Sequence, residues 1–464
     1  MQFELHFWDV FFVLLYFIGL IVLGIFKSPK QKSNDDFLIA GRKLSLGAFV
    51  ATLVSTFYGG ILGVGEFTYQ FGLVSWFTQG FFYYVFALLY ALYLAPKIQR
   101  NQHYTLPDQL YASYNKSTGL LGSFFTFILV SPAPYVLMVG VLIHMVFGWS
   151  ITVSILIGAL FSTIYVLFGG FRAVVRTDIL QFFLMFAGFG ILLPFAWAKL
   201  GNLFELLPQL PAGHTSLVGK LSIQKIGAWV IIALWTIVSP SFYQRCSAAK
   251  NENIARKGIL TAIGFWFVFD MMTLSAGFYA RFALEGIDPV MAFPLLGELV
   301  LPVGIKGIFL VGMLAIIMSS LDSYSFLSAI TLGRDFIWRL RGSKDNQKKI
   351  ILFTRWGLLA SLVFSIFLAI GFQSVIDIWY ILGSVAIPVL LIPIWTSFFP
   401  RLKLSAESTF RMMVTTSVVS IFWLISGYVM AVANQPVYVL GIEPMYPGLV
   451  VSIGWWILGF LRKK

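Results

Sequence analysis

The sequence lacks the residues from which disulfide frameworks and metal centres are usually built. It has one cysteine, Cys246, and four histidines in 464 residues. A single cysteine cannot form an intrachain disulfide or a cysteine-based zinc site. The histidines are too scattered along the chain to predict a metal cluster. Each of them is therefore interpreted as structural: His6, His103, His144 and His214.

Charged residues are also scarce. They make up 11% of the chain, against about 25% in a typical soluble protein, while 59% of the residues are hydrophobic. This composition excludes a set of soluble domains and predicts one all-α, polytopic membrane bundle. The first apolar run, 8–26, follows the acidic Glu4 instead of a basic segment, so it is interpreted as a retained span and not as a signal peptide.

Apolar segments long enough to cross a bilayer, at about 1.5 Å of rise per residue, recur along the whole chain. Their number predicts a bundle of about 13 transmembrane helices. The predicted spans are 8–26, 47–70, 74–96, 118–145, 148–168, 178–198, 223–245, 257–282, 306–332, 350–371, 376–398, 411–431 and 446–462.

The net charge of +13 is unevenly distributed over the loops. Lysine and arginine follow the first span in 27–43 and recur in alternate loops up to the tail 462–464, whereas 283–305 and 432–445 carry none. The positive-inside rule then predicts an N-terminus outside the cell membrane and a cytoplasmic C-terminus. The positive charge also suits an anionic inner leaflet of the lipid bilayer, and it forms no nucleic-acid footprint.

The segment 47–70 is the most unusual of these spans. Its middle holds Gly59, Gly60, Gly63 and Gly65, which are poor helix formers. A helix that breaks in mid-membrane leaves backbone groups without partners, and such a break survives only where it lines a cavity or binds a ligand. Broken helices of this kind hold substrate and ion in secondary transporters.

A second interruption is predicted in 223–245, where Pro240 removes a helical hydrogen bond and disfavours helix at Ser239. The segment 47–70 is the first of five consecutive predicted spans, and 223–245 is the first of the next five. Because five is an odd number, the second unit has the opposite orientation in the membrane to the first. We therefore predict a 5+5 inverted repeat with discontinuous first helices. The predicted units are 1–46 (an extra span and a cytoplasmic loop), 47–198 (the first repeat), 199–222 (an external loop), 223–398 (the inverted repeat) and 399–464 (two further spans).

A hydroxyl-rich stretch lies inside the predicted span 306–332. Ser319, Ser320, Asp322 and Ser323 place four oxygen side chains within five residues. Residues three apart share a helix face, and a hard cation prefers oxygen ligands, so this stretch predicts an ion site. A single serine would more simply bond to its own helix, but an embedded carboxylate favours the ion.

Carboxylates inside predicted spans are functional candidates because burying a charge in the bilayer is costly. Glu66 is placed toward the outer vestibule, and Asp178 lies near Arg172 and Arg176, where a structural salt bridge is an equal alternative. Asp270 has no evident partner in the sequence and receives no role.

Four segments together resemble the signature segments of the sodium/solute symporter family, in the same order and at similar spacing. The resemblance covers nearly the whole chain and implies a leucine-transporter fold with an extra N-terminal span. The segments are Asp36-Phe-Leu-Ile-Ala-Gly-Arg-Lys43, Gly169-Gly-Phe-Arg-Ala-Val-Val-Arg-Thr-Asp-Ile-Leu-Gln181, Gln244-Arg-Cys-Ser-Ala-Ala-Lys250 and Ser319-Ser-Leu-Asp-Ser323.

The resemblance also implies a sodium site between the broken helix and the eighth core helix. Its ligands would be carbonyls of the former, and a carbonyl with two hydroxyls of the latter. Some members of the family hold a second sodium near the inner end of that helix. By position the first set corresponds to Leu53, Thr56, Ile316, Ser319 and Ser320, and the second to Asp178, Asp322 and Ser323.

The expected substrate pocket departs from that of the sugar-carrying branch, which has polar amide and acid side chains in the broken helix. The Ser-Pro-Ser at 239–241 is instead similar to the branch that carries proline, pantothenate or other small carboxylates. The aromatic members of the expected pocket have a plainer alternative as packing or interfacial residues. The expected lining is Ser55, Tyr58, Gly59, Gly60, Trp76, Gln79, Tyr135, Trp235, Ser239, Ser241 and Tyr243, with Trp379 as a further member.

These observations predict a sodium-coupled symporter that imports a small organic solute by alternating access, with Na⁺ as the coupled ion. A proton-coupled symporter, with Asp178 or Asp322 as the carrier, and a membrane solute sensor are the alternatives. A sensor usually carries an attached signalling domain, and none follows the last span in this sequence. An enzyme is not expected, because no nucleophile, base and metal set converges in the sequence.

Overall fold

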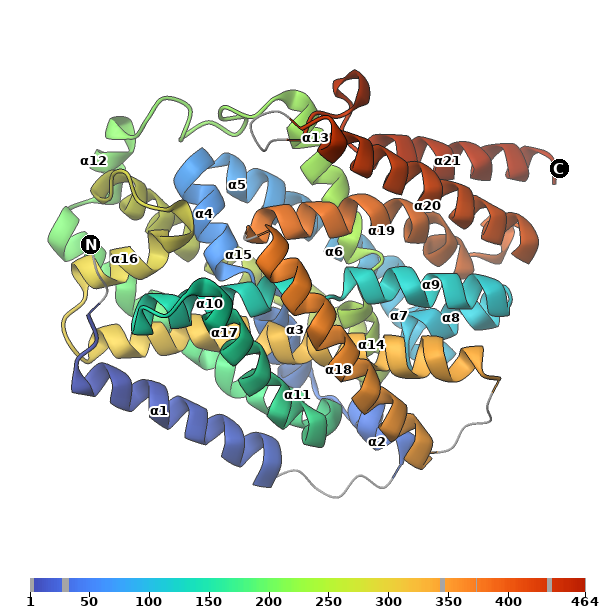
Figure 1. Cartoon of the computed structure of the whole chain (residues 1–464), viewed down its shortest axis with the longest axis horizontal. Helices are drawn as coiled ribbons and strands as arrows, with labels where there is room; N and C mark the ends of the chain where they lie inside the picture. The colour runs from blue at the N-terminus through green and yellow to red at the C-terminus, as the bar shows by residue number, and fades with distance from the viewer. Residues whose placement is uncertain (1–3, 27–32, 343–346, 373, 432–435, 464) are drawn as a thin grey trace.

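A computed structural model describes residues 4–26, 33–342, 347–372, 374–431 and 436–463. The predicted cytoplasmic segment 27–32 and parts of the loops at 343–346 and 432–435 lie outside the described residues. The described chain is all-helical (Figure 1). The helices are α1 (Phe7–Ile21), α2 (Asn34–Ile39), α3 (Leu46–Phe57), α4 (Ile61–Phe71), α5 (Val74–Trp76), α6 (Phe82–Leu89), α7 (Ala95–Asn101), α8 (Leu106–Ser113), α9 (Lys116–Leu129), α10 (Ala133–Phe147), α11 (Ile151–Leu200), α12 (Leu203–Leu206), α13 (Ile223–Ile232), α14 (Pro240–Ala248), α15 (Glu252–Ala283), α16 (Ala292–Val300), α17 (Ile305–Ile330), α18 (Gln347–Phe372), α19 (Val375–Ser397), α20 (Ala406–Val429) and α21 (Met445–Leu461).

The number of long apolar helices differs from the sequence prediction of thirteen. Among the described residues, ten helices are long and apolar enough to cross a membrane, and the bent pair α3–α4 makes an eleventh span. The predicted spans 148–168 and 178–198 lie in the one helix α11, which is kinked at Gly170, and α21 (Met445–Leu461) is apolar but shorter. The count of thirteen is therefore not confirmed, and the 5+5 repeat and the domain limits drawn from it stay predictions.

The predicted break in 47–70 is present. Helix α3 ends at Phe57, α4 begins at Ile61, and the two axes differ by 54°. Two glycines in the break permit close approach of other elements. A β-carbon on Gly59 would overlap the Ser320 side chain of α17, and one on Gly60 would overlap the Trp379 ring of α19. Glycine is required at the break because only a residue without a side chain fits there.

The interruption predicted in 223–245 is also present. Helix α13 runs into a 3₁₀ turn, Ala233–Thr236, and α14 starts at Pro240 with Ser239 extended as its N-cap. Proline is well placed there because the first turn of a helix needs no donor from it. A further interruption was not predicted: the expected span 118–145 divides into α9 and α10 around Pro132.

Helix α17 lies at the centre of the bundle and continues as a π-helical segment, η8 (Thr331–Trp338). It packs so closely on α11 that a β-carbon on Gly188 would lie 3.1 Å from the Gly312 Cα. Its N-terminus is held by Asp9 of α1, whose Oδ1 accepts from the backbone N–H groups of Gly304 and Gly307, both at 2.8 Å. A carboxylate at a helix N-terminus satisfies free donors and complements the helix dipole. The extra first span thus fixes the hydroxyl-rich helix in place.

Candidate cation and solute site

The hydroxyl-rich stretch of α17 faces the broken span α3–α4. Ser319, Ser320, Asp322 and Ser323 are all at most 1% exposed. The Ser320 hydroxyl donates to the carbonyl oxygen of Thr56 at 2.6 Å. That carbonyl lies in the last turn of α3, where the break removes its usual helical donor. The two elements that the sequence predicts to share an ion site are therefore in direct contact.

A carboxylate joins this contact. The Ser319 hydroxyl donates to Asp178 Oδ1 at 2.6 Å and to Ser55 Oγ at 2.9 Å. Asp178 belongs to α11 and is fully buried. Leu53 and Ile316, whose carbonyls are the other expected ligands, are buried one turn before Thr56 and Ser320 on the same two helices. The donor set is made of oxygens alone, which suits an alkali cation such as sodium.

A buried arginine lies directly beside this oxygen set. The Nη2 atom of Arg245, on α14, donates to the hydroxyls of Ser323 at 2.7 Å, Thr56 at 2.8 Å and Thr52 at 3.1 Å. It also lies 3.5 Å from Asp178 Oδ2, and both side chains are fully buried. The guanidinium therefore supplies positive charge next to the carboxylate without a bound ion.

The sequence analysis missed the role of this arginine. Arg245 was considered there only as part of a signature segment. The structure places Asp178 and Ser323, two members of the expected second sodium set, in contact with its guanidinium. The signal available in the sequence was an arginine within the predicted span 223–245, two residues after the expected pocket residue Tyr243. The alternative of a salt bridge from Asp178 to Arg172 is not what the structure shows, because Arg172 pairs with Asp36 at 2.6 Å.

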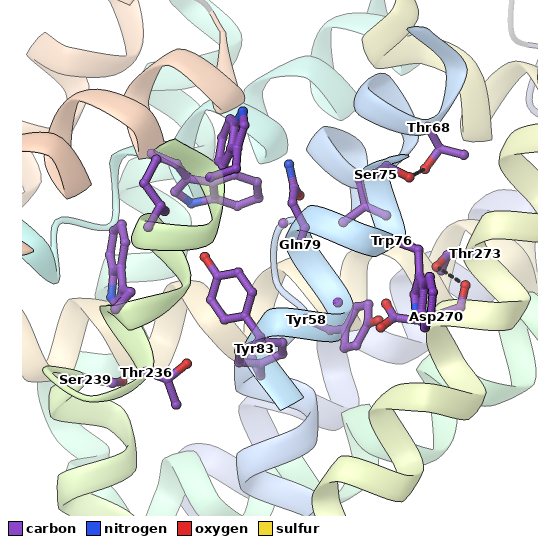
Figure 2. A pocket seen from close by; sticks show the side chains of 18 of the residues that line it. Tyr58, Thr68, Ser75, Trp76, Gln79, Tyr83, Thr236, Ser239, Asp270 and Thr273 are labelled. Carbon is purple, nitrogen blue, oxygen red and sulfur yellow. Dashed lines mark hydrogen bonds between the residues drawn. The ribbon is translucent and has the colours of Figure 1, made fainter. Parts of the chain in front are cut away.

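A cavity lies next to the oxygen set, between the broken span, α13–α14 and α15 (Figure 2). The space that the centre of a water molecule can reach in it is about 120 Å³. One water needs about 10–15 Å³ by the same measure, so the cavity has room for a small organic molecule. Of the expected pocket residues, eight line it, and so does Trp379: Tyr58, Gly60, Trp76, Gln79, Tyr135, Trp235, Ser239 and Ser241.

Three expected pocket residues lie elsewhere. Ser55 points to Ser319 in the oxygen set, and Gly59 abuts the Ser320 side chain. Tyr243 is fully buried on α14 and is not among the lining residues. The sequence placed Ser55 and Gly59 in the pocket by their position in the broken helix, and Tyr243 by its nearness to the Ser-Pro-Ser at 239–241, but successive residues of a helix face different directions.

The cavity wall also contains residues that the sequence analysis did not assign to it. Asp270 and Thr273 come from α15, Thr236 from the turn between α13 and α14, and Tyr83 from α6. The Tyr84 hydroxyl donates to Asp270 Oδ2. An acidic residue in mid-span was a visible signal, but its partners lie more than a hundred positions away in the sequence.

Ion pairs gather at the opposite, predicted cytoplasmic, ends of the helices. Asp108 of α8 accepts from Arg334 of η8 at 3.0 Å and also from Arg339. Burial raises the pKa of Asp108, but Arg334 and Arg339 lower it by more, so this pKa is below its ordinary value of 3.8. The Arg42 guanidinium donates to the carbonyl of Gln102 at 2.6 Å. These contacts join α8 to η8 and its end, and the segment before α3 to the end of α7.

Comparison with known proteins bears on the whole chain. The model of the family described as "Sodium:solute symporter family" matches residues 37–402. The high-affinity choline transporter 1 of Drosophila melanogaster is 22% identical, over 94% of this chain and 72% of its own length. The osmoregulated proline transporter OpuE of Bacillus subtilis is 22% identical, over 95% and 93%. The sodium/pantothenate symporter of Haemophilus influenzae is 26% identical, over 74% of each chain.

Solved structures agree on the fold. A Na⁺-coupled sialic acid symporter in a substrate-bound, outward-open state superposes with a TM-score of 0.81 at 18% identity, covering 99% of this chain and 98% of that one. Mhp1, a nucleobase-cation-symport-1 family transporter in a closed conformation, gives a TM-score of 0.62 at 14% identity, with 93% and 95% covered. The likeness covers at least 93% of this chain in both cases, so these proteins share its fold.

Proposed function

Because this chain belongs to the sodium:solute symporter family, we propose that it imports a small organic solute together with sodium by alternating access. The protein is a multi-pass membrane transporter, not an enzyme, and sodium is its coupled ion. The observation that carries this proposal is the contact between the Ser320 hydroxyl and the Thr56 carbonyl at the break between α3 and α4.

The proposed sodium ligands are the backbone carbonyls of Leu53, Thr56 and Ile316 and the hydroxyls of Ser319 and Ser320. These oxygens come from two helices, so a cation held by all of them would bind α3 to α17. The hydrogen bond that Ser320 gives to the Thr56 carbonyl supports this proposal because it brings oxygens of the two helices into direct contact. Sodium would stabilise the conformation in which α3 and α17 are in contact. Loss of sodium would remove this stabilisation and allow the two helices to separate.

A second sodium at Asp178, Asp322 and Ser323 is the less favoured arrangement. The Arg245 guanidinium already donates to Ser323 and lies beside Asp178. A second cation there would have to share the carboxylate with a fixed positive charge, and like charges at this separation repel strongly. We therefore propose one coupled sodium per cycle.

The proposed orientation has the N-terminus outside and the C-terminus in the cytoplasm. It is supported by the basic residues of the alternate loops and by the ion pairs of Asp108, which join helix ends on the predicted cytoplasmic side. In this orientation these ion pairs tie the inner side together, while the cavity lies nearer the outer half of the broken span. The arrangement supports solute entry from outside.

The solute is proposed to occupy the cavity beside the broken span. Its space suits a molecule of the size of an amino acid or a small carboxylate. Relatives that carry choline, proline and pantothenate support a small organic solute without selecting among them. A sugar is disfavoured because the broken span lacks the amide and acid side chains that the sugar-carrying branch has there, and carries Ser55, Tyr58, Gly59 and Gly60 instead.

The test is sodium binding to purified protein, followed as thermal stabilisation in sodium against potassium at fixed pH. Wild-type protein should be stabilised by sodium, and Ser319→Ala with Ser320→Ala should lose this stabilisation while still reaching the membrane. Ser328→Ala is the matched control, because Ser328 lies on the same helix but pairs with Ser361 at 2.6 Å, away from the oxygen set. Undiminished sodium stabilisation in the double variant would refute the site, and stabilisation by acid instead of sodium would favour the proton-coupled alternative.

A further inference from the structure

One wall of the cavity carries a carboxylate that the proposed sodium site does not use. Asp270 of α15 lines the cavity together with Trp76, Tyr58 and Thr273. Figure 2 shows it next to the Trp76 and Tyr58 side chains, on the side opposite Thr236 and Ser239. A β-carbon on Gly80 would lie 2.7 Å from Asp270 Oδ2, so the facing helix leaves space for this carboxylate.

The carboxylate has a hydrogen-bond donor but no cation among its described neighbours. The Tyr84 hydroxyl donates to Oδ2, and no described lysine or arginine approaches Asp270 within 4 Å. A charged carboxylate in a membrane helix costs about 2.5–3.5 kcal/mol even on the mild insertion scale. Arg245 offsets this cost for Asp178, whereas nothing in the described chain does so for Asp270. A cationic ligand in the cavity would.

The surroundings of Asp270 suit an organic cation in particular. Tyr58, Trp76 and Tyr83 line the same cavity with aromatic rings. The faces of such rings attract ammonium groups, and this attraction is strongest where water is excluded. A carboxylate flanked by aromatic rings therefore favours an ammonium group over a bare metal ion, which would need several further oxygens.

The opposite wall has the complementary chemistry. Trp235 Nε1 and Thr236 Oγ1 are buried without a hydrogen-bond partner among the described residues, and so is Gln79 Nε2 at the middle of the cavity. All three groups can donate a hydrogen bond. A buried donor without a partner costs about 1–3 kcal/mol, which a ligand acceptor would recover. These donors suit a carboxylate or a similar acceptor at the other end of the solute.

We propose that the cavity binds a small zwitterion, with its ammonium group against Asp270 and its carboxylate against Trp235, Thr236 and Gln79. This proposal rests on the proposed function, because it takes the cavity to be the solute site of the symporter. It narrows the range of proposed solutes. Small anions without an ammonium group and cations without a hydrogen-bond acceptor are excluded.

The experiment is a thermal-shift screen of full-length purified protein, in sodium and in potassium, with matched probes. The probes are the common amino acids and trimethylglycine, each compared with the acid in which carbon replaces the nitrogen (cyclopentanecarboxylate for proline, 3,3-dimethylbutyrate for trimethylglycine) and with the amine that lacks the carboxylate. At least one zwitterion should stabilise the wild-type protein, and both of its truncated analogues should bind at least about 10-fold more weakly.

Variants then test the two ends of the ligand. Asp270→Asn should weaken the zwitterion at least about 30-fold, because losing one partner of a desolvated charge pair typically costs this much or more. Tyr84→Phe keeps the charge and should change the affinity by only a few-fold. Glu66→Gln is the matched control, since Glu66 also belongs to the broken span but does not line the cavity.

Three outcomes would overturn the proposal: no zwitterion stabilises the wild-type protein, a carbon analogue binds as tightly as its zwitterion, or Asp270→Asn binds the zwitterion as wild type does. The thermal stabilisation that sodium causes in the absence of solute is measured in the same experiment. Its absence from wild-type protein would count against the proposed function, whereas an intact sodium shift with any of these outcomes would count against the zwitterion alone.

Discussion

The oxygen set between α3 and α17 and the cavity beside it are both buried and both adjoin the broken span, yet their polar atoms differ in one respect. In the oxygen set, Ser319, Ser320, Thr52 and Thr56 bond to one another, to Asp178 or to Arg245. In the cavity, Gln79, Trp235 and Thr236 each keep a buried polar atom without a partner in the described chain. The hydroxyls of the first region already have partners within the chain, whereas the second region presents donors with which a solute can pair.

The difference has a simple physical reading. Polar atoms that hold one another are part of the folded structure, and their removal destabilises it. Polar atoms that lack partners lower the stability of the ligand-free protein, and they are retained where a ligand satisfies them. The comparison predicts that the same substitution should act on folding in one region and on solute binding in the other.

The largest effect is expected from Arg245→Met. This change leaves the Asp178 carboxylate buried without its positive partner, which typically costs about 3–5 kcal/mol of stability. Thermal unfolding of the detergent-purified protein measures it. The double variant Asp178→Leu with Arg245→Met should recover part of the loss, because no unpaired charge remains. Equal stability of the single variant and wild type would mean that Arg245 does not neutralise Asp178.

A matched pair of threonine substitutions tests the comparison directly. Thr52 donates to Asp178 and accepts from Arg245, so Thr52→Val should lower stability by about 1–3 kcal/mol. Thr236→Val removes a hydroxyl that has no described partner, so it should leave stability unchanged or slightly higher and weaken solute binding about 10-fold. Similar losses of stability in the two variants would erase the distinction between the regions.

Close approach at the break gives a smaller, more specific effect. A β-carbon in Gly59→Ala would overlap Ser320, so the two helices must separate at an expected cost of about 1–3 kcal/mol. We expect sodium affinity to fall about 10-fold, read as a shift in the sodium concentration that gives half-maximal thermal stabilisation. Gly264→Ala is the control, because a β-carbon there meets nothing within 4 Å. Equal sodium affinities in the two variants would contradict the proposed ligand geometry.

The smallest effect concerns the inner ion pairs and pH. The pKa of Asp108 is lower in the folded protein than its ordinary value of 3.8, because Arg334 and Arg339 outweigh the effect of burial. Its contribution to stability is therefore complete above about pH 4 and lost as the pH falls through the folded pKa. The stability difference between wild type and Asp108→Asn should be present at pH 7 and should shrink as the pH falls below about 4. A difference that persists undiminished at lower pH would show that the ionised carboxylate is not its source.

Much of the fold and part of the site were predictable because they depend on local chemistry. Glycines in an apolar segment predicted the break at 58–60, and Ser239-Pro240 predicted the start of α14. Four oxygen side chains in one turn predicted that α17 faces another element at Ser319 and Ser320. The family resemblance, confirmed over residues 37–402, set the expected pairing of these segments.

Other features were missed because they depend on contacts across the chain. Apolar length alone does not reveal the interruption at Pro132, or that the predicted spans 148–168 and 178–198 lie in one helix kinked at Gly170. The count of thirteen spans is not confirmed. Ser55 was assigned to the pocket by its position in the broken helix, but its side chain turns to Ser319.

The sequence by itself determined that this protein is a membrane transporter with a broken span and a hydroxyl-bearing helix, because hydrophobicity, glycine content and residue spacing act within one segment. Only the tertiary structure decided what each buried charge meets. Asp178 and Asp270 are both carboxylates of predicted spans, but packing brings the Arg245 guanidinium to the first and an aromatic cavity to the second. The energy of a buried charge depends on its neighbours in space, and these come from helices far apart in the sequence.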